Sequence, residues 1–200
     1  MIAAGIAAAA RLLTGARAHW RGCEPTTRQR IYFANHTSNL DIVLLWAALP
    51  PLLRQRTRPV GAQDYWLGGV IREYLARKVF RAVMIERHRV TKENNPLTPM
   101  IDTLAGGESL IIFPEGTRHA DGQVGDFKPG IYHLAKARPD VEFVPVYIEN
   151  LNRVLPKGEV LPVPILCSVN FGTPIVMETG ETKMNFLART RTAVLSLKPV

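Results

Sequence analysis

Short apolar runs alternate with longer helix-forming segments along this chain of 200 residues, and this alternation limits its fold more than any other feature. The runs at 31–34, 109–113 and 141–148 have the length and composition of buried strands. Strands that alternate with helices build a mostly parallel sheet between helical layers. We therefore expect an α/β fold, namely a single-domain αβα sandwich with a mixed, mostly parallel sheet.

The size and composition fit one folded domain with a full core. Hydrophobic residues make up 46% of the chain and charged residues 21%, which is ordinary for a globular protein and argues against disorder. The two cysteines, Cys23 and Cys167, lie far apart and match neither a disulfide framework nor a metal-ligand spacing. We expect a reducing compartment, no metal and no cofactor.

The formal net charge of +8 calls for an anionic partner. The candidates are nucleic acid, an anionic membrane surface or a phosphorylated small molecule. No nucleic-acid-binding motif accompanies the basic residues, and few aromatic residues are interleaved with them. We therefore expect no nucleic-acid partner.

Residues 1–22 are predicted to form an N-terminal amphipathic, membrane-associating helix, and residues 23–200 the main domain. Alanine dominates the first part, which favours a helix. The uncharged run stops at Arg11, well short of the ~20 residues that span a bilayer. The C-terminal end of this segment carries residues that suit a lipid surface, namely Arg11, Arg17, His19, Trp20 and Arg21. The alternative is a helix that simply covers the sheet.

Two further patterns predict packing. After Asp64, large apolar residues recur at helical spacing and indicate a buried stripe: Trp66, Val70 and Tyr74, with Leu67, Ile71 and Leu75 beside them. Pro145 lies within the apolar run 141–148, which indicates an edge strand or a bulge because proline cannot donate to a sheet ladder.

The turn from Asn35 to Asp41 joins a predicted strand to a predicted helix, where open α/β sheets place their active sites. One interpretation is structural: Ser38 caps the helix and Asp41 lies at its third position, as in a capping box. The other is chemical: the ring of His36 folds back so that Asp41 orients the imidazole as a base.

The segment from Phe113 to Arg118 follows the strand at 109–113 and is a second candidate for the same crevice. Gly116 allows the backbone to approach a ligand, Thr117 adds a hydroxyl, and Arg118 offers a planar donor set for phosphate. The alternative is a polar turn in which Glu115 and Arg118 form a surface ion pair.

These two motifs together resemble those of the glycerolipid acyltransferases, most closely the 1-acylglycerol-3-phosphate (lysophosphatidic acid) acyltransferases. The resemblance rests on His-x4-Asp at 36–41 and Phe-Pro-Glu-Gly-Thr-Arg at 113–118, with weaker matches at 83–87 and 144–146. It implies an enzyme that moves a fatty acyl group from acyl-CoA or acyl-carrier protein to the free hydroxyl of 1-acylglycerol-3-phosphate. Residues 23–200 would be the acyltransferase domain.

The resemblance also implies residue roles. His36 would be the general base and Asp41 its orienting partner. Arg87 would bind the acceptor's phosphate, and Pro145 would shape the acyl-donor side. The pocket for the acceptor would be built by Glu115, Gly116, Thr117 and Arg118. No serine nucleophile is needed, because the acceptor alcohol itself attacks the thioester.

One departure from the family concerns the position after the short predicted strand at 59–62, where many relatives carry a lysine and this chain has Gln63. Gln63 is the candidate oxyanion donor, but it brings no positive charge. A different lysolipid acceptor, such as lyso-ornithine lipid, is therefore an alternative. A basic membrane-binding protein without catalysis and a hydrolase in which His36 activates water are others. The expected location is the cytoplasmic face of a membrane, held peripherally or monotopically.

Overall fold

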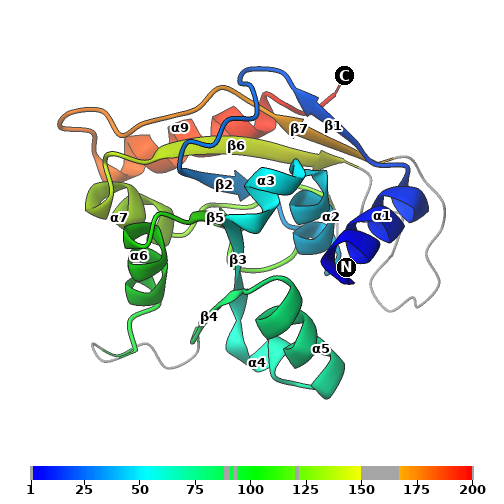
Figure 1. Cartoon of the computed structure of the whole chain (residues 1–200). Coiled ribbons are helices and arrows are strands. Elements are labelled where there is room, and N and C mark those ends of the chain that lie inside the picture. The colour runs from blue at the N-terminus through cyan, green and yellow to red at the C-terminus, as the bar shows by residue number, and fades with distance from the viewer. Residues whose placement is uncertain (1, 88–90, 92–93, 120–121, 150–166, 200) are drawn as a thin grey trace.

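One mixed sheet forms the centre of the protein, as seen in a computed structural model that describes residues 2–87, 91, 94–119, 122–149 and 167–199. Seven strands pair in the order β1-β7-β6-β2-β5-β3-β4 (Figure 1). Every pairing is parallel except that of β6 with β7. This confirms the predicted α/β fold. The strands are β1 (Arg17–Trp20), β2 (Arg30–Ala34), β3 (Thr57–Ala62), β4 (Val83–Ile85), β5 (Ser109–Ile112), β6 (Glu142–Glu149) and β7 (Ser168–Phe171).

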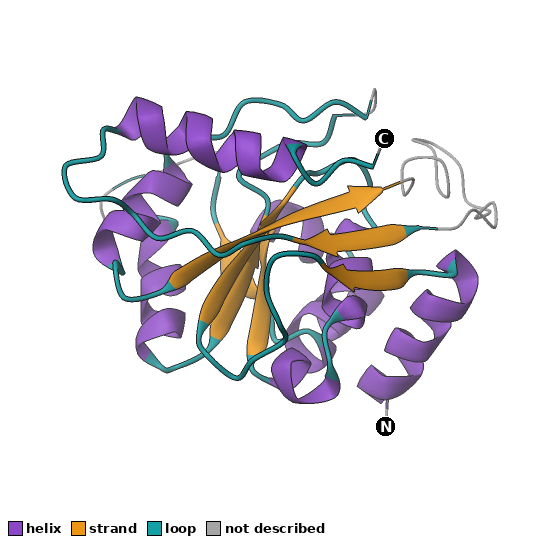
Figure 2. Ribbon diagram, turned by 90° about the horizontal axis from the view of Figure 1, so that it is seen from above, coloured by secondary structure: helices purple, strands orange, loops and turns teal. Residues whose placement is uncertain are grey.

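Helices cover both faces of this sheet, and Figure 2 shows the sheet lying between them. The described helices are α1 (Ile2–Thr14), α2 (Asp41–Ala48), α3 (Pro51–Gln55), α4 (Gln63–Trp66), α5 (Val70–Tyr74), the π-helical turn η1 (Leu75–Val79), α6 (Leu97–Ala105), α7 (Gly130–Ala137) and α9 (Lys183–Leu195). One core cluster joins α1, α2 and η1 to one sheet face, and a second joins α6, α7 and α9 to the other.

The central strand β2 illustrates why both faces are apolar. Successive side chains of a strand point to opposite faces, so Tyr32 and Ala34 enter the first core cluster while Ile31 and Phe33 enter the second. All four are at most 1% exposed. A continuous apolar run is therefore the correct pattern for this strand, because neither face of it meets solvent.

The N-terminal segment differs from the predicted 22-residue helix. α1 ends at Thr14, and residues 17–20 form the edge strand β1, which pairs with β7. The Trp20 ring stacks on Phe171 with centroids 3.9 Å apart, and the Arg11 guanidinium donates to the Ala47 carbonyl at 2.6 and 2.9 Å. The predicted boundary at residue 22 is therefore wrong, since sheet pairing captures the second half of the segment.

Pro145 was predicted to mark an edge or a bulge, but β6 is an interior strand between β2 and β7. The Pro145 carbonyl accepts from the Gly172 amide at 2.9 Å, just beyond the last paired residue of β7, Phe171. In a strand the amide and carbonyl of one residue face the same neighbour. The side of Pro145 that has no amide hydrogen therefore faces the point where β7 ends. The hydrogen bonds between β6 and its two neighbouring strands are otherwise kept.

The predicted core stripe after Asp64 is only partly buried. Trp66 is 5% exposed, whereas Val70 is 87%, Ile71 76% and Tyr74 46% exposed. The helix expected to carry all of them is broken, because α4 ends at Trp66 and α5 starts only after Gly68 and Gly69. Interrupting the helix removes the common face that the spacing implied.

Candidate active site

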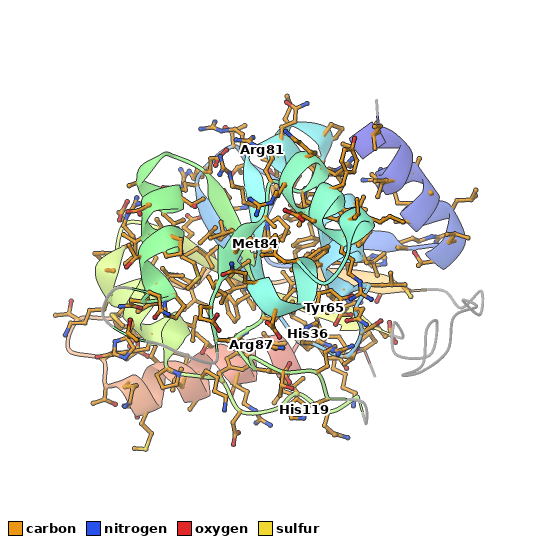
Figure 3. The ribbon with its side chains drawn as sticks, turned by 90° about the horizontal axis from the view of Figure 1, so that it is seen from below. His36, Tyr65, Arg81, Met84, Arg87 and His119 are labelled. Carbon is orange, nitrogen blue, oxygen red and sulfur yellow. The ribbon has the colours of Figure 1, made fainter. Side chains whose placement is uncertain are left out.

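A cavity of about 380 Å³ opens where β2, β3 and β5 end, the position at which parallel sheets place their sites. His36 and part of the segment 113–118 line it together, so the structure joins the two motifs predicted to share a crevice. Figure 3 labels His36, Tyr65 and Arg87, which all line this cavity, and Arg81, which lies at the far end of the molecule.

His36 and Asp41 form the predicted pair. Nδ1 of the imidazole lies 2.8 Å from Oδ2 of Asp41, whose carboxylate is fully buried. A carboxylate can only accept, so Nδ1 is the donor of this contact, and in a neutral imidazole the lone pair is then on Nε2. The ring also stacks on Phe113, with centroids 4.4 Å apart. Stacking and the carboxylate together hold the imidazole at the cavity wall.

The capping interpretation of this turn holds in part as well. Oδ2 of Asp41 also accepts from the backbone amides of Thr37 at 2.6 Å and Ser38 at 2.8 Å, which is the return contact of a capping box. The hydroxyl of Ser38 instead accepts from the Leu40 amide at 3.3 Å, and α2 begins at Asp41. One carboxylate oxygen therefore shapes the turn and orients the imidazole.

Glu115 has a different place from the predicted one. Its side chain is 1% exposed and does not line the cavity. Oε1 accepts from the backbone amide of His36 at 2.7 Å, and Oε2 from that of Gly125 at 2.8 Å. Burial is the main reason that the pKa of this carboxyl is raised. Glu115 therefore positions the His36 loop through backbone contacts. Neither the predicted place in the acceptor pocket nor the alternative surface pair with Arg118 fits this burial.

Among the residues that the structure describes, three cationic side chains line the cavity: Arg87, Arg118 and Lys128. Nη2 of Arg87 donates to Asp64 at 2.7 Å, so part of its charge is already balanced. Lys128 was missed by the sequence reasoning; its stem packs close to Gly116, which has a φ of +68°. The signal available was weak, because a lone lysine before a helix is usually a solvated surface residue.

The remaining wall of the cavity is mostly apolar. These residues come from both sides of the strand ends and include Trp66, Met100, Ile112, Ile131 and Leu134. A cavity lined by both cations and aliphatic and aromatic side chains fits an amphipathic ligand.

Besides the buried carboxylates of Asp41 and Glu115, three predicted site residues do not line this cavity. Thr117 and Gln63 are exposed at its surroundings, and Pro145 is buried within the sheet. Gln63 is the first residue of α4, and its neighbours Ala62 and Tyr65 line the cavity in its place. Thr117 follows Gly116, which adopts a left-handed conformation, and its exposed side chain does not line the cavity. These three roles are not supported by the geometry.

The amino-acid sequence of this chain is similar to those of curated acyltransferases. The mouse (Mus musculus) 1-acyl-sn-glycerol-3-phosphate acyltransferase alpha is 28% identical over 179 residues, which are 84% of this chain and 58% of the mouse protein. The chloroplastic 1-acyl-sn-glycerol-3-phosphate acyltransferase BAT2 of Brassica napus is 29% identical over 128 residues, 64% of this chain and 35% of that protein. The chain thus spans little more than half the length of the mouse relative.

The fold matches that of a solved structure, the 1-acyl-sn-glycerophosphate (LPA) acyltransferase PlsC from Thermotoga maritima. The TM-score is 0.77 at 21% identity, and the match covers 98% of this chain and 77% of the other. The sequence profile of the family described as Acyltransferase matches residues 19–149, a range that contains both motifs and every residue named above as lining the cavity. The chain belongs to the Acyltransferase family.

Proposed function

We propose that this protein transfers a fatty acyl group from a thioester donor, acyl-CoA or acyl-carrier protein, to the free hydroxyl of 1-acylglycerol-3-phosphate, giving phosphatidate. The observation that carries the proposal is the His36–Asp41 pair at the wall of a cavity lined by both cationic and apolar side chains. The curated relatives named 1-acyl-sn-glycerol-3-phosphate acyltransferase support the choice of acceptor.

His36 would act as the base. Nε2 takes the proton of the acceptor hydroxyl while the hydroxyl oxygen forms a bond to the thioester carbonyl carbon. The carbon–sulfur bond then breaks, and the imidazolium returns the proton to the leaving thiolate. Asp41 stabilises the imidazolium through Nδ1. A positioned base is typically worth about 10²- to 10⁴-fold in rate.

The cationic and the apolar side chains of the cavity would bind different parts of the substrates. Arg118, Lys128 and the partly balanced Arg87 would hold the phosphate of the acceptor, and the apolar residues would hold an acyl chain. No cofactor is required for this chemistry, because the thioester itself supplies the activated acyl group.

The lysolipid acceptor and the phosphatidate product are membrane lipids, and we place the protein peripherally or monotopically at the cytoplasmic face of an anionic membrane. None of the described helices is long and apolar enough to cross a bilayer. α1 docks on α2 through a face that includes Ala3, Ala7 and Ala10, and leaves Leu12 and Leu13 exposed by 86% and 56%. α1 thus packs against α2 with one face and presents exposed leucines to lipid with another.

The test is release of free thiol when acyl-CoA, 1-acylglycerol-3-phosphate and enzyme are mixed. His36→Ala should lower kcat by about 10²- to 10⁴-fold, since the base is removed. Asp41→Asn should also lower kcat, because an amide cannot stabilise the imidazolium as a carboxylate does. Full turnover in His36→Ala would refute the mechanism.

The identity of the acceptor needs a separate measurement. A panel of lysolipids with and without a phosphomonoester should show preference for 1-acylglycerol-3-phosphate, and Arg118→Gln should raise its KM. Equal rates with phosphate-free lysolipids would favour the same chemistry on another acceptor. That outcome has a structural basis, since Asp64 already neutralises part of the Arg87 charge. Release of fatty acid without any acceptor would indicate a hydrolase.

A further inference from the structure

α5 exposes a stripe of large apolar side chains that the fold leaves uncovered. Val70, Ile71 and Tyr74 are 87%, 76% and 46% exposed, and they lie within about 100° of one another around a helix of 3.6 residues per turn. α5 buries none of its own residues. An apolar cluster of this kind on a surface helix is typical of an interaction site.

Basic side chains accompany this stripe. Arg72 lies within α5, and Arg77 and Lys78 follow one turn later in η1, all of them exposed. One acidic residue, Glu73, belongs to the same segment and pairs with Arg77 at 2.8 Å. The segment 70–78 therefore combines exposed aliphatic groups with a net positive charge, a combination that suits an anionic lipid surface.

In the sequence, the stripe closely follows residues that line the candidate active site. α4 precedes α5, and its Tyr65 and Trp66 line the cavity. The Arg72 guanidinium lies over the Tyr65 ring, 4.8 Å from its centroid, and so ties α5 to a residue of the cavity wall. Figure 1 shows α4 and α5 projecting together from the end of β3, away from α6, α7 and α9.

We propose that Val70, Ile71 and Tyr74 of α5, together with Arg72, Arg77 and Lys78, form a docking surface for an anionic bilayer, which brings the cavity mouth to the lipid surface. This inference rests on the proposed function, because a lipid acceptor would then enter beside Tyr65 without crossing water. The aliphatic side chains enter the acyl boundary and the cations meet the headgroups.

Vesicle co-sedimentation tests this surface directly. In Val70→Ser/Ile71→Ser the partition coefficient onto vesicles of phosphatidylcholine with phosphatidylglycerol should fall by about tenfold or more, since two aliphatic side chains leave the lipid. The matched control is Val176→Ser/Met184→Ser, which removes two other exposed apolar residues, 51% and 75% exposed. The control should bind as the wild type does. Equal loss in both double variants, or none in the first, would overturn the proposal.

A spectroscopic measurement locates the contact without using activity. The emission that Val70→Trp adds to that of the three native tryptophans should be quenched by vesicles that contain brominated lipid, and the emission that Val176→Trp adds should not. Absence of quenching at Val70 would refute docking whether or not the protein transfers acyl groups. Conversely, quenching at Val70 in a protein without acyl transfer would retain the docking surface and reject the proposed function.

Two other outcomes have distinct signatures. If the stripe joins two copies of this chain instead, sedimentation velocity will show a dimer that Val70→Ser/Ile71→Ser converts to a monomer while vesicle binding is unchanged, and this would overturn the proposal. If docking feeds the active site, the rate on vesicle-borne acceptor relative to dispersed short-chain acceptor should fall several-fold in the same variant. An unchanged ratio would contradict the link between docking and substrate entry.

Discussion

At the scale of single residues, buried carboxylates organise the candidate active site. Oδ2 of Asp41 accepts from the His36 ring and from the amides of Thr37 and Ser38. Glu115 accepts from the His36 amide on the other side. His36 is thus held through its ring and its backbone by two separate carboxylates. Only the first of these could be read from the spacing of the motif, because the second contact joins residues 79 positions apart.

The Glu115 carboxyl gives a pH-dependent prediction. Burial raises its pKa in the folded chain above the unfolded value of about 4.3. Folding then favours the protonated form, so this group's contribution to stability falls as pH rises through the unfolded and then the folded pKa. The side chain in Glu115→Gln stays neutral at every pH, so the variant does not show this decrease in stability as pH rises.

The measurement is urea unfolding of both proteins at pH of about 4 and about 7. At the lower pH Glu115→Gln should be less stable by about 1–3 kcal/mol, because its amide cannot accept from both backbone amides. The deficit should narrow at the higher pH. A deficit that widens with pH would contradict a raised pKa for Glu115.

At the scale of elements, the C-terminal end of α2 is where the N-terminal segment is fastened. The carbonyls of Ala47 and Leu49 accept from Arg11 of α1 and from Arg54 of α3. Arg54 also lies over the Trp46 ring, 5.1 Å from its centroid. Cations at a helix C-terminus satisfy its unpaired carbonyls and its dipole. Arg11, expected at a lipid surface, is therefore engaged within the protein.

Removing Arg11 should loosen α1. Arg11→Gln should lower the free energy of unfolding by about 1–3 kcal/mol, the usual worth of hydrogen bonds from a charged donor. It should also increase proteolytic cleavage near Gly15, where the chain leaves the helix. Arg17→Gln on the exposed strand β1 is the matched control and should have little effect. Equal effects of both changes would mean that the contacts of Arg11 with α2 contribute nothing specific.

At the scale of the whole molecule, the net charge of +8 and the exposed apolar residues act together. Each basic residue near an anionic bilayer contributes roughly 1 kcal/mol, and this term is screened by salt. Apolar insertion is not screened in the same way. The two contributions can therefore be separated by ionic strength.

Binding of the wild-type protein to anionic vesicles should fall at least several-fold between about 0.1 M and about 1 M NaCl, which shortens the Debye length from ~10 Å to ~3 Å. Residual binding at high salt should fall in Val70→Ser/Ile71→Ser, because the aliphatic stripe contributes to it. Co-sedimentation with and without phosphatidylglycerol measures both terms. Binding that is indifferent to salt would contradict an electrostatic contribution from the basic residues.

Local patterns in the sequence determined the fold class and half of the candidate active site. Strand and helix periodicities and the His36–Asp41 spacing lie within a few residues of the chain, so the pattern of elements and this pair could be predicted from local sequence. The family motifs added the second loop, which the structure places beside the first.

Only the tertiary structure decided the contacts between distant segments. Strand pairing turned residues 17–20 into β1, the Gly68–Gly69 break left Val70 and Ile71 outside the core, and Lys128 entered the cavity wall from a loop far along the chain. Pro145 and Gln63 were misplaced for the same reason. Whether a side chain meets solvent, a backbone amide or a cavity depends on what packs against it, and spacing along the chain carries no record of that.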